Sequence, residues 1–180
     1  MKKRLILLSI LVLGGALRFY LLGKIPVSLY SDEVAIGYNA YSILMTGRDE
    51  FGDKFPINFR SFNDYKPPFV IYLTAIFERF LGLTDLAVRL PAALSGLTAI
   101  ILIYLLVKKL NFSDRIALIS ALFLAVNPWH MIFSRALLEV QIALTLAMAG
   151  AVCFLLGNRK PIFYMGAAIF WSFSLYTYHA

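Results

Sequence analysis

The sequence is poor in the residues that build disulfide-linked or metal-binding proteins. Its 180 residues include one cysteine, Cys153, and two histidines, and no repeat of fixed period or low-complexity segment is present. A lone cysteine inside an apolar run provides neither a disulfide framework nor a metal-binding motif. We therefore expect Cys153 to be a small residue that faces lipid or another helix. No metal-ligand spacing is present, which leaves open both a metal-free site and one that uses a divalent metal.

Charged residues are also scarce, and acidic residues are fewer than basic ones. Only 15% of the residues are charged, 61% are hydrophobic, and the net charge is +7. This composition lies outside the range of ordinary soluble domains and predicts an integral membrane protein. We do not expect a nucleic-acid partner, because basic residues in membrane proteins gather in cytoplasmic loops for topological reasons.

Apolar runs of near-spanning length predict an all-α, multi-pass helical bundle. The basic residues before the first run place the N-terminus in the cytoplasm. No small-x-small cleavage site follows this run, so we expect a retained anchor helix rather than a signal peptide, with Arg18 reaching the outer interface. The predicted spans are residues 5–22, 90–107, 116–133, 138–156 and 162–178.

The segment from Pro68 to Leu83 has two readings. Glu78 and Arg79 interrupt it after about ten apolar residues, fewer than the roughly 20 that a span needs. If it crossed the membrane, the later basic clusters would face outward. The positive-inside bias therefore favours a helix lying at the outer interface, within an outer loop that covers residues 28–89.

The first part of this loop, from Ser28 to Pro68, is the one long polar stretch. It holds six of the ten acidic residues: Asp32, Glu33, Asp49, Glu50, Asp53 and Asp64. Ser31 and Gly47 are good N- and C-caps for a helix between them. An apolar-aromatic face at helical spacing suits a helix at the membrane interface, formed by Val34, Tyr38, Tyr41 and Met45. Residues 48–65 have no clear period and predict an irregular loop.

Three groups of residues are candidates for chemistry. Asp32 and Glu33 either start a helix or act as a general base or metal ligand. Lys66 is fixed by the two prolines that follow it, and binds either a substrate phosphate or ordinary lipid headgroups.

The third group is the stretch NPWHMIFSRALLE. Arg135 and Glu139 are four residues apart, which predicts either a simple ion pair across one helical turn or a functional pair at the mouth of a span. His130 is either an interfacial aromatic residue or a contact for substrate or metal.

These pieces resemble, in order, a known family. The stretches RFYLLGKIPVSLYSDEVAIGYNAYSILMTG, YKPPFVIYLTAIFERFLG, AVRLPAALSG and NPWHMIFSRALLE are similar to the N-terminal half of polyprenol-phosphate-sugar-dependent glycosyltransferases. These are membrane enzymes of the GT-C class, in the family 39 group that includes protein O-mannosyltransferases and the aminoarabinose transferase of lipid A. The resemblance implies a GT-C helical bundle with interfacial helices in the first outer loop. We therefore expect the 180 residues to be the N-terminal part of a longer membrane module.

The resemblance also implies roles for individual residues. Asp32 matches the acidic residue at the catalytic centre, with Glu33 beside it, and Lys66 matches the lysine that contacts the lipid-carrier phosphate. Glu139 lies where members have a second acidic residue, usually Asp. Some members hold a metal through a carboxylate or histidine beside the Lys-Pro-Pro motif, where this chain has Tyr65.

The resulting hypothesis is a glycosyltransferase that moves a sugar from a polyprenyl-phosphate donor to a glycan, lipid or protein acceptor at the outer face. Asp32 or Glu33 would take the acceptor's proton during a direct displacement that inverts the anomeric centre. Lys66, helped by Arg60 or Arg135, would stabilise charge on the departing phosphate. Two rival hypotheses are a transporter or flippase of lipid-linked sugars and a non-catalytic membrane protein.

Overall fold

A computed structural model describes residues 2–61 and 64–178 of the chain. In these residues it contains eight helices and one two-stranded antiparallel sheet. The helices are α1 (Lys2–Phe19), α2 (Ser31–Thr46), α3 (Pro68–Leu81), α4 (Asp85–Lys109), α5 (Asp114–Val126), α6 (Pro128–Arg135), α7 (Glu139–Gly157) and α8 (Ile162–Leu175), and the strands are β1 (Phe59–Ser61) and β2 (Asp64–Lys66). The predicted all-α membrane fold is confirmed.

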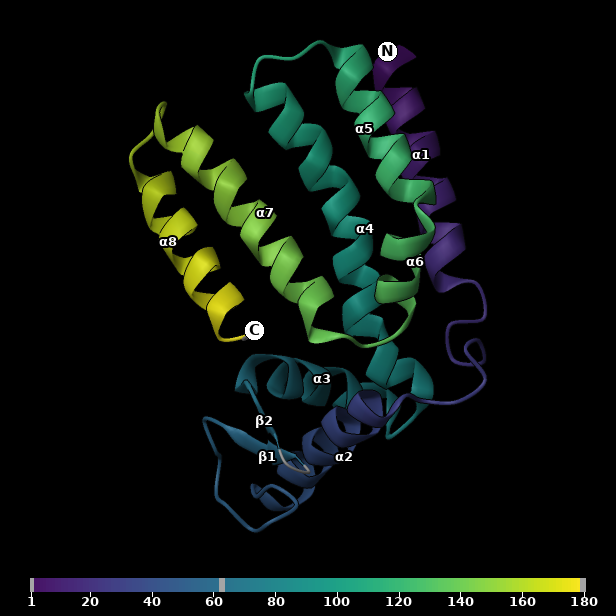
Figure 1. Cartoon of the computed structure of the whole chain (residues 1–180), viewed down its shortest axis with the longest axis vertical. Helices are drawn as coiled ribbons and strands as arrows, with labels where there is room; N and C mark the ends of the chain where they lie inside the picture. The colour runs from purple at the N-terminus through teal and green to yellow at the C-terminus, as the bar shows by residue number, and fades with distance from the viewer. Residues whose placement is uncertain (1, 62–63, 179–180) are drawn as a thin grey trace.

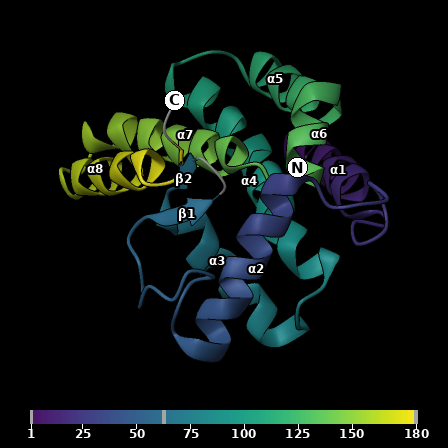
Figure 2. The same cartoon turned by 60° about the horizontal axis from the view of Figure 1, so that its bottom comes forward.

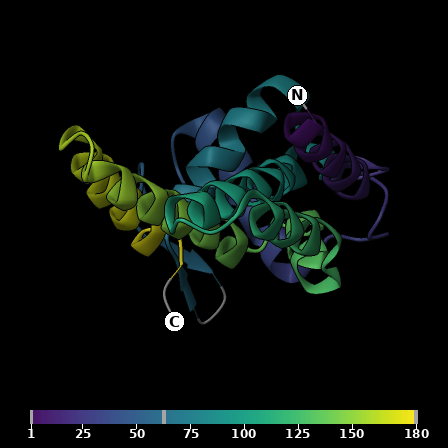
Figure 3. The same ribbon diagram turned by 90° about the horizontal axis from the view of Figure 1, so that it is seen from above.

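The long helices form a bundle in which α4 lies at the centre. α7 packs along one side of α4, while α5 and α1 pack along the other, and α8 packs on the outer side of α7 (Figure 1). Seen from above, the light-green α7 and the yellow α8 form an arm that extends away from the purple α1 (Figure 3). A small apolar cluster joins α1, α4 and α5, formed by Ile10, Ile100, Ala121 and Ala125.

Among the described residues, α4 and α7 are long and apolar enough to cross a membrane unaided, and α5 with α6 forms a third candidate as a bent pair. α8, with 14 residues, is shorter than the roughly 20 residues that a span needs. α1 has 18 residues, but four of them are basic, so it is too highly charged to be counted as a span by composition. The five-span arrangement therefore stays a prediction. The predicted span over residues 116–133 is not one straight helix, because the chain bends by 56° where α5 ends before Pro128. Proline has no backbone N–H and interrupts the helical hydrogen bonds at this point.

The predicted outer loop forms a separate layer at one end of the bundle. α3 lies across the ends of α4 and α7, and α2 crosses beneath it (Figures 1 and 2). With 14 residues, α3 is about 21 Å long, which is shorter than the roughly 30 Å hydrocarbon core. This arrangement agrees with an interfacial helix rather than a span. An apolar cluster between α2, α3 and α4 holds the layer in place, and it includes Ile36, Val70, Ile71 and Val88.

Local signals in this layer were predicted with mixed success. Gly47 is the C-cap of α2, with a left-handed backbone at φ +68° that glycine adopts without strain. The N-cap is Tyr30 rather than Ser31, and its N–H donates to Glu33 Oε2 at 2.9 Å. The predicted apolar-aromatic face of α2 is exposed. The described part of residues 48–65 is more regular than predicted, because β1 and β2 form an antiparallel pair with Phe59 opposite Lys66.

Candidate active site

The candidate site centres on Lys66, the last residue of β2. Its ammonium Nζ lies 3.0 Å from Asp32 Oδ1 and 3.1 Å from Glu139 Oε1, so it bridges the start of α2 and the start of α7. Pro67 and Pro68 follow, and Pro68 begins α3. Because the prolines fix the backbone between β2 and α3, the base of the lysine side chain has little freedom.

The two carboxylates keep Lys66 cationic. Burial lowers the pKa of Lys66, but the negative charges of Glu139 and Asp32 and their hydrogen bonds outweigh burial, so the pKa lies above the usual lysine value. The side chains of Lys66 and Glu139 are 9% and 12% exposed, whereas that of Asp32 is 39% exposed. Asp32 is thus the member of this group that solvent or a substrate can reach.

A cavity of about 650 Å³ opens beside this group. The first turn of α2, the preceding segment, α6 and the start of α7 line it, and its polar side chains include Asp32, Glu33 and Glu139. Most of the wall is apolar, with Leu29, Ile132, Phe133, Leu138 and Val140 among its residues. Small-molecule sites commonly combine such an apolar wall with a few fixed polar groups.

Glu33 also borders the cavity, but its carboxylate is already bound on all sides. Oε1 accepts from Arg89 Nε at 3.0 Å and from Leu137 N at 3.0 Å, while Oε2 accepts from Tyr30 N. The residue is 1% exposed. The Arg89 side chain and two backbone N–H groups therefore occupy the positions from which an acceptor hydroxyl would have to approach this carboxylate. The base role predicted for Asp32 or Glu33 stays a prediction, and the geometry favours Asp32, whose side chain is more exposed.

Arg89 is the residue near the site that sequence reasoning missed. It lies in α4, is fully buried, and donates to the carbonyls of Leu22, Pro26 and Ser28 in addition to Glu33. It therefore fixes the segment between α1 and α2 that forms one wall of the cavity. The stretch AVRLPAALSG contained the signal, because an arginine within an otherwise apolar helix needs an internal partner.

The two arginines that were predicted to assist Lys66, Arg135 and Arg60, contact other groups. The guanidinium of Arg135 donates hydrogen bonds to four backbone carbonyls, those of Leu17, Arg18, Tyr20 and Ile25. It ends α6 while Glu139 begins α7, so the predicted helical pair between them is wrong. Arg60 is exposed and lies over the Phe51 ring at 5.0 Å. It alternates with Phe59, which pairs opposite Lys66, so it points to the other face of the hairpin.

Arg18 and His130 form a buried network inside the bundle. Arg18 is fully buried rather than at the interface as predicted, and it donates to the carbonyls of Leu124 and Ala125 at the end of α5. In a continuous helix the Leu124 carbonyl would bond to the N–H of residue 128, which is proline here. Arg18 therefore satisfies the carbonyls that the bend at Pro128 leaves free.

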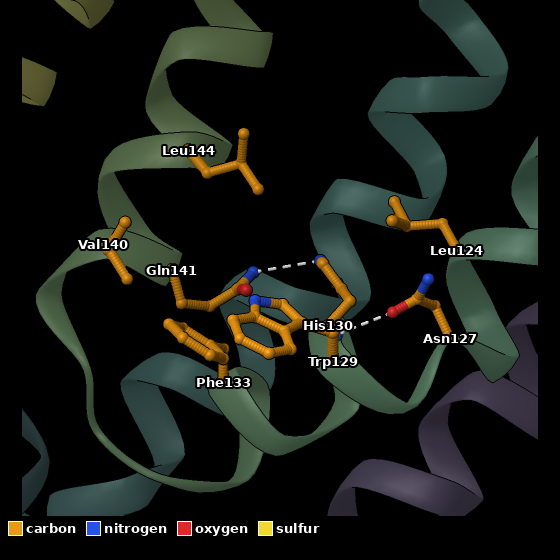
Figure 4. A pocket seen from close by; sticks show the side chains of 8 residues that line it. All are labelled: Leu124, Asn127, Trp129, His130, Phe133, Val140, Gln141 and Leu144. Atoms are coloured by element: carbon orange, nitrogen blue, oxygen red, sulfur yellow. Dashed lines mark hydrogen bonds between the residues drawn. The ribbon is translucent and has the colours of Figure 1, made fainter.

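His130 occupies the other side of this network. It is 6% exposed, and its Nδ1 and Nε2 lie 2.8 Å from Arg18 Nη2 and 3.2 Å from Gln141 Nε2. A second cavity of about 390 Å³ extends from these side chains between apolar residues of α5, α6 and α7 (Figure 4). Because both ring nitrogens of His130 already have partners, a structural role explains it better than the predicted substrate or metal contact.

The acidic middle of the loop does not gather around the site. Asp49 is buried, and its Oδ1 accepts from the backbone N–H groups of Phe51 and Asp53, which closes a tight turn. Within residues 2–61 and 64–178, no three His, Cys, Asp or Glu side chains lie close enough together to hold a metal ion. The candidate site therefore consists of Lys66 and two carboxylates beside a largely apolar cavity.

Comparison with known proteins gives one family. The sequence model of the family described as dolichyl-phosphate-mannose-protein mannosyltransferase matches residues 65–178, a segment that runs from the residue before Lys66 to the end of the described chain. No curated protein and no solved structure matches the chain.

Proposed function

Because the chain belongs to the dolichyl-phosphate-mannose-protein mannosyltransferase family, we propose that it transfers a sugar to an acceptor on the outer face of the membrane with inversion at the anomeric carbon. The family consists of membrane glycosyltransferases of the GT-C type that use a sugar donor linked to a polyprenyl phosphate. The acceptor is a glycan, a lipid or a protein.

The observation that carries this proposal is the position of the Lys66 ammonium between Asp32 and Glu139, beside a cavity of about 650 Å³. A phosphate-linked donor requires a cation for its phosphate and a base for the acceptor. The site supplies both within one hydrogen-bonded group. The Glu139 side chain is 12% exposed and its Oε1 lies 3.1 Å from Lys66 Nζ, so its proposed role is to position the ammonium.

The reaction follows from these roles. The acceptor oxygen attacks the anomeric carbon while Asp32 takes its proton, and the bond from the anomeric carbon to the phosphate oxygen breaks. Its electron pair leaves with the phosphate, whose charge grows by one unit. The cationic Lys66 stabilises this charge in a partly dehydrated site, where such a contribution is large. Attack from the side opposite the phosphate inverts the anomeric configuration.

The shape of the two cavities supports an amphipathic donor. Phe133 and Val140 line both the cavity at Asp32 and the second cavity, so the two adjoin between α6 and α7. The second cavity is lined mainly by apolar side chains, among them Leu124 and Leu144 (Figure 4). The sugar and phosphate would lie at the polar end, with the first isoprenyl units along the apolar end.

The charge distribution supports an outward-facing site. The N-terminus and the connection between α4 and α5 lie at the end of the bundle opposite α2 and α3 (Figure 1). Lys3 and Lys108 both form ion pairs with Asp114 at that end, and Lys108 Nζ lies 2.6 Å from Asp114 Oδ1. Since basic residues favour the cytoplasmic side, the layer that carries Asp32 and Lys66 would face outward.

Binding of the carrier tests the role of Lys66. We expect Lys66→Gln to weaken binding of undecaprenyl phosphate about tenfold or more, since a hydrogen bond to a charged group contributes roughly 1.5–3 kcal/mol. Native mass spectrometry in lipid nanodiscs measures this affinity. Lys54→Gln is the matched control, because Lys54 is an exposed lysine of the same loop. Equal carrier affinity in the Lys66 and Lys54 variants would contradict the assignment.

A further inference from the structure

A third cavity, of about 370 Å³, lies on another side of the first turns of α2. It is lined by Ser31, Val34, Ala35, Tyr38, Glu50 and Phe51. Ser31 and Asp32 are consecutive residues at the start of α2, so the first turn of this helix separates the third cavity from the one at Asp32. Residues in this cavity have no part in the mechanism described above.

The polar wall of this cavity is held in place. Asn39 donates from Nδ2 to Glu50 Oε1 at 3.1 Å, and the backbone N–H of Glu50 donates to Asn39 Oδ1 at 3.1 Å. Asn39 itself is 1% exposed and also donates to the Ala35 carbonyl. One carboxylate oxygen of Glu50 is therefore anchored from the core, although the residue as a whole is exposed.

The aromatic walls are exposed, and one of the two rings is restrained by a neighbouring side chain. Tyr38 and Phe51 are 52% and 53% exposed. The guanidinium of Arg60 lies 5.0 Å from the centre of the Phe51 ring, which is the geometry of a cation–π contact and restrains that ring. Two aromatic rings, an anchored carboxylate and the Ser31 hydroxyl thus surround one small cavity.

We propose that this cavity binds a pyranose ring of the acceptor, an inference that rests on the proposed function. A sugar ring presents C–H faces that pack on aromatic rings and hydroxyls that donate to a carboxylate, and both partners are present here. An acyl chain would fit less well, because it would remove the Glu50 carboxylate from water without replacing its hydrogen bonds.

The location explains how such a ring would assist the reaction. An acceptor that extends around the first turn of α2 places one sugar in this cavity and its reactive hydroxyl beside Asp32. Contacts remote from the reacting atoms orient the substrate for transfer. In the proposed function the donor occupies the cavity at Asp32 and Glu139, so donor and acceptor approach Asp32 from different sides of the helix.

Saturation-transfer NMR on the complete protein in nanodiscs tests the proposal without requiring turnover. The probes are methyl β-D-glucopyranoside, methyl α-D-mannopyranoside and, as an apolar ring without the array of sugar hydroxyls, cyclohexanol. We expect at least one glycoside to receive saturation through its ring protons. Tyr38→Ala and Glu50→Gln should each reduce this signal roughly fivefold. Tyr41→Ala is the matched control, because Tyr41 is exposed on α2 but does not line the cavity.

Several outcomes would overturn the proposal. The first is that neither glycoside receives saturation, and the second is that cyclohexanol receives as much as the glycosides. The third is that the Tyr38→Ala and Tyr41→Ala variants give equal glycoside signals. The fourth is that a Ser/Thr-rich peptide binds in place of the glycosides. The Asp32→Asn variant should retain the glycoside signal. A protein that binds glycoside at Tyr38 but transfers no sugar would keep this site and reject the proposed function, so the two failures are distinguishable.

Discussion

Replacing Glu33 with glutamine tests whether Glu33 and Asp32, adjacent at the start of α2, have the different roles that we propose for them. Glu33 is 1% exposed and accepts hydrogen bonds from Tyr30 N, Arg89 Nε and Leu137 N, whereas the neighbouring Asp32 side chain is 39% exposed. The two residues are adjacent in the sequence, yet the structure predicts opposite consequences for stability and activity.

The magnitude follows from the contacts of each carboxylate. Removing one partner of a buried ion pair destabilises a protein by about 3–5 kcal/mol. Glutamine keeps one oxygen that can accept from both Arg89 Nε and Leu137 N, but it loses the negative charge and presents an NH₂ group where Tyr30 N needs an acceptor, so we expect a loss of about 3 kcal/mol for Glu33→Gln. Asp32→Asn breaks a partly exposed pair and should change the free energy of unfolding by about 1 kcal/mol or less.

The assay is equilibrium unfolding in detergent micelles, followed by tryptophan fluorescence as the fraction of SDS increases, together with sugar transfer per mole of folded protein. We expect Glu33→Gln to lose stability but to keep most of its transfer rate once the rate is corrected for folded protein. Arg89→Gln should destabilise similarly, and the double variant by less than the sum of the two, because both remove the same interaction. An unfolding free energy of Glu33→Gln within about 0.5 kcal/mol of the parent would refute this reasoning.

Two further predictions concern the helix packing that supports the site. Glu78 in α3 is 3% exposed, neither of its carboxylate oxygens has a hydrogen-bond partner among the described residues, and burial raises its pKa from 4.5 to about 8. The unfolded chain therefore loses this proton at lower pH than the folded one, so stability should decrease as the pH rises from about 4.5 to 8. Glu78→Gln should flatten this dependence in melting curves recorded across that range. An unchanged pH profile in the variant would contradict the prediction. In α4, a Cβ at Gly96 would lie 2.1 Å from Ser134 Oγ, so Gly96→Ala should lower the unfolding free energy by roughly 1–3 kcal/mol. The control Gly15→Ala, with no atom within 4 Å of its added Cβ, should not lower it, and equal losses in the two variants would show that the close contact has no influence.

The sequence predicted the features of the fold that depend on neighbouring residues. Apolar run length marked α4 and α7 as spans, and the interruption at Glu78 marked α3 as too short to cross. Gly47 marked the end of α2, since only a local left-handed turn is needed there. These signals act within a few residues, so they can be recognised without the fold.

Features that depend on distant partners could not be predicted in the same way. The bond between Glu33 and Arg89 joins residues 56 apart, and that between Lys66 and Glu139 joins residues 73 apart. Nothing local distinguishes Glu33 from Asp32, and the family resemblance alone indicated that Asp32 and Lys66 belong to one site. Pro128 in the sequence indicates a bend after Asn127. The carbonyls that this bend leaves without helical partners are satisfied by Arg18, which lies in another helix and could not be identified from local sequence.

The role of Arg18 also bears on the transporter hypothesis. An ionisable residue buried in a helical bundle often marks a transport pathway. Here its Nη1 and Nη2 groups contact the Gly14, Leu124 and Ala125 carbonyls and His130, which accounts for its position through helix packing. The structure therefore gives this residue a supporting role beside the proposed site.

The central claim is that Asp32 is the base for sugar transfer beside Lys66, and the transfer rate of Asp32→Asn tests it most directly. The complete protein is supplied in membranes with a radiolabelled polyprenyl-phosphate sugar, and Asp53→Asn serves as the control for an exposed acid of the same loop. Loss of a general base lowers the rate by a factor of about 10² to 10⁴, so we predict at least a hundredfold loss for Asp32→Asn and a normal rate for Asp53→Asn. A rate for Asp32→Asn within about threefold of the parent, with the protein folded, would contradict the account.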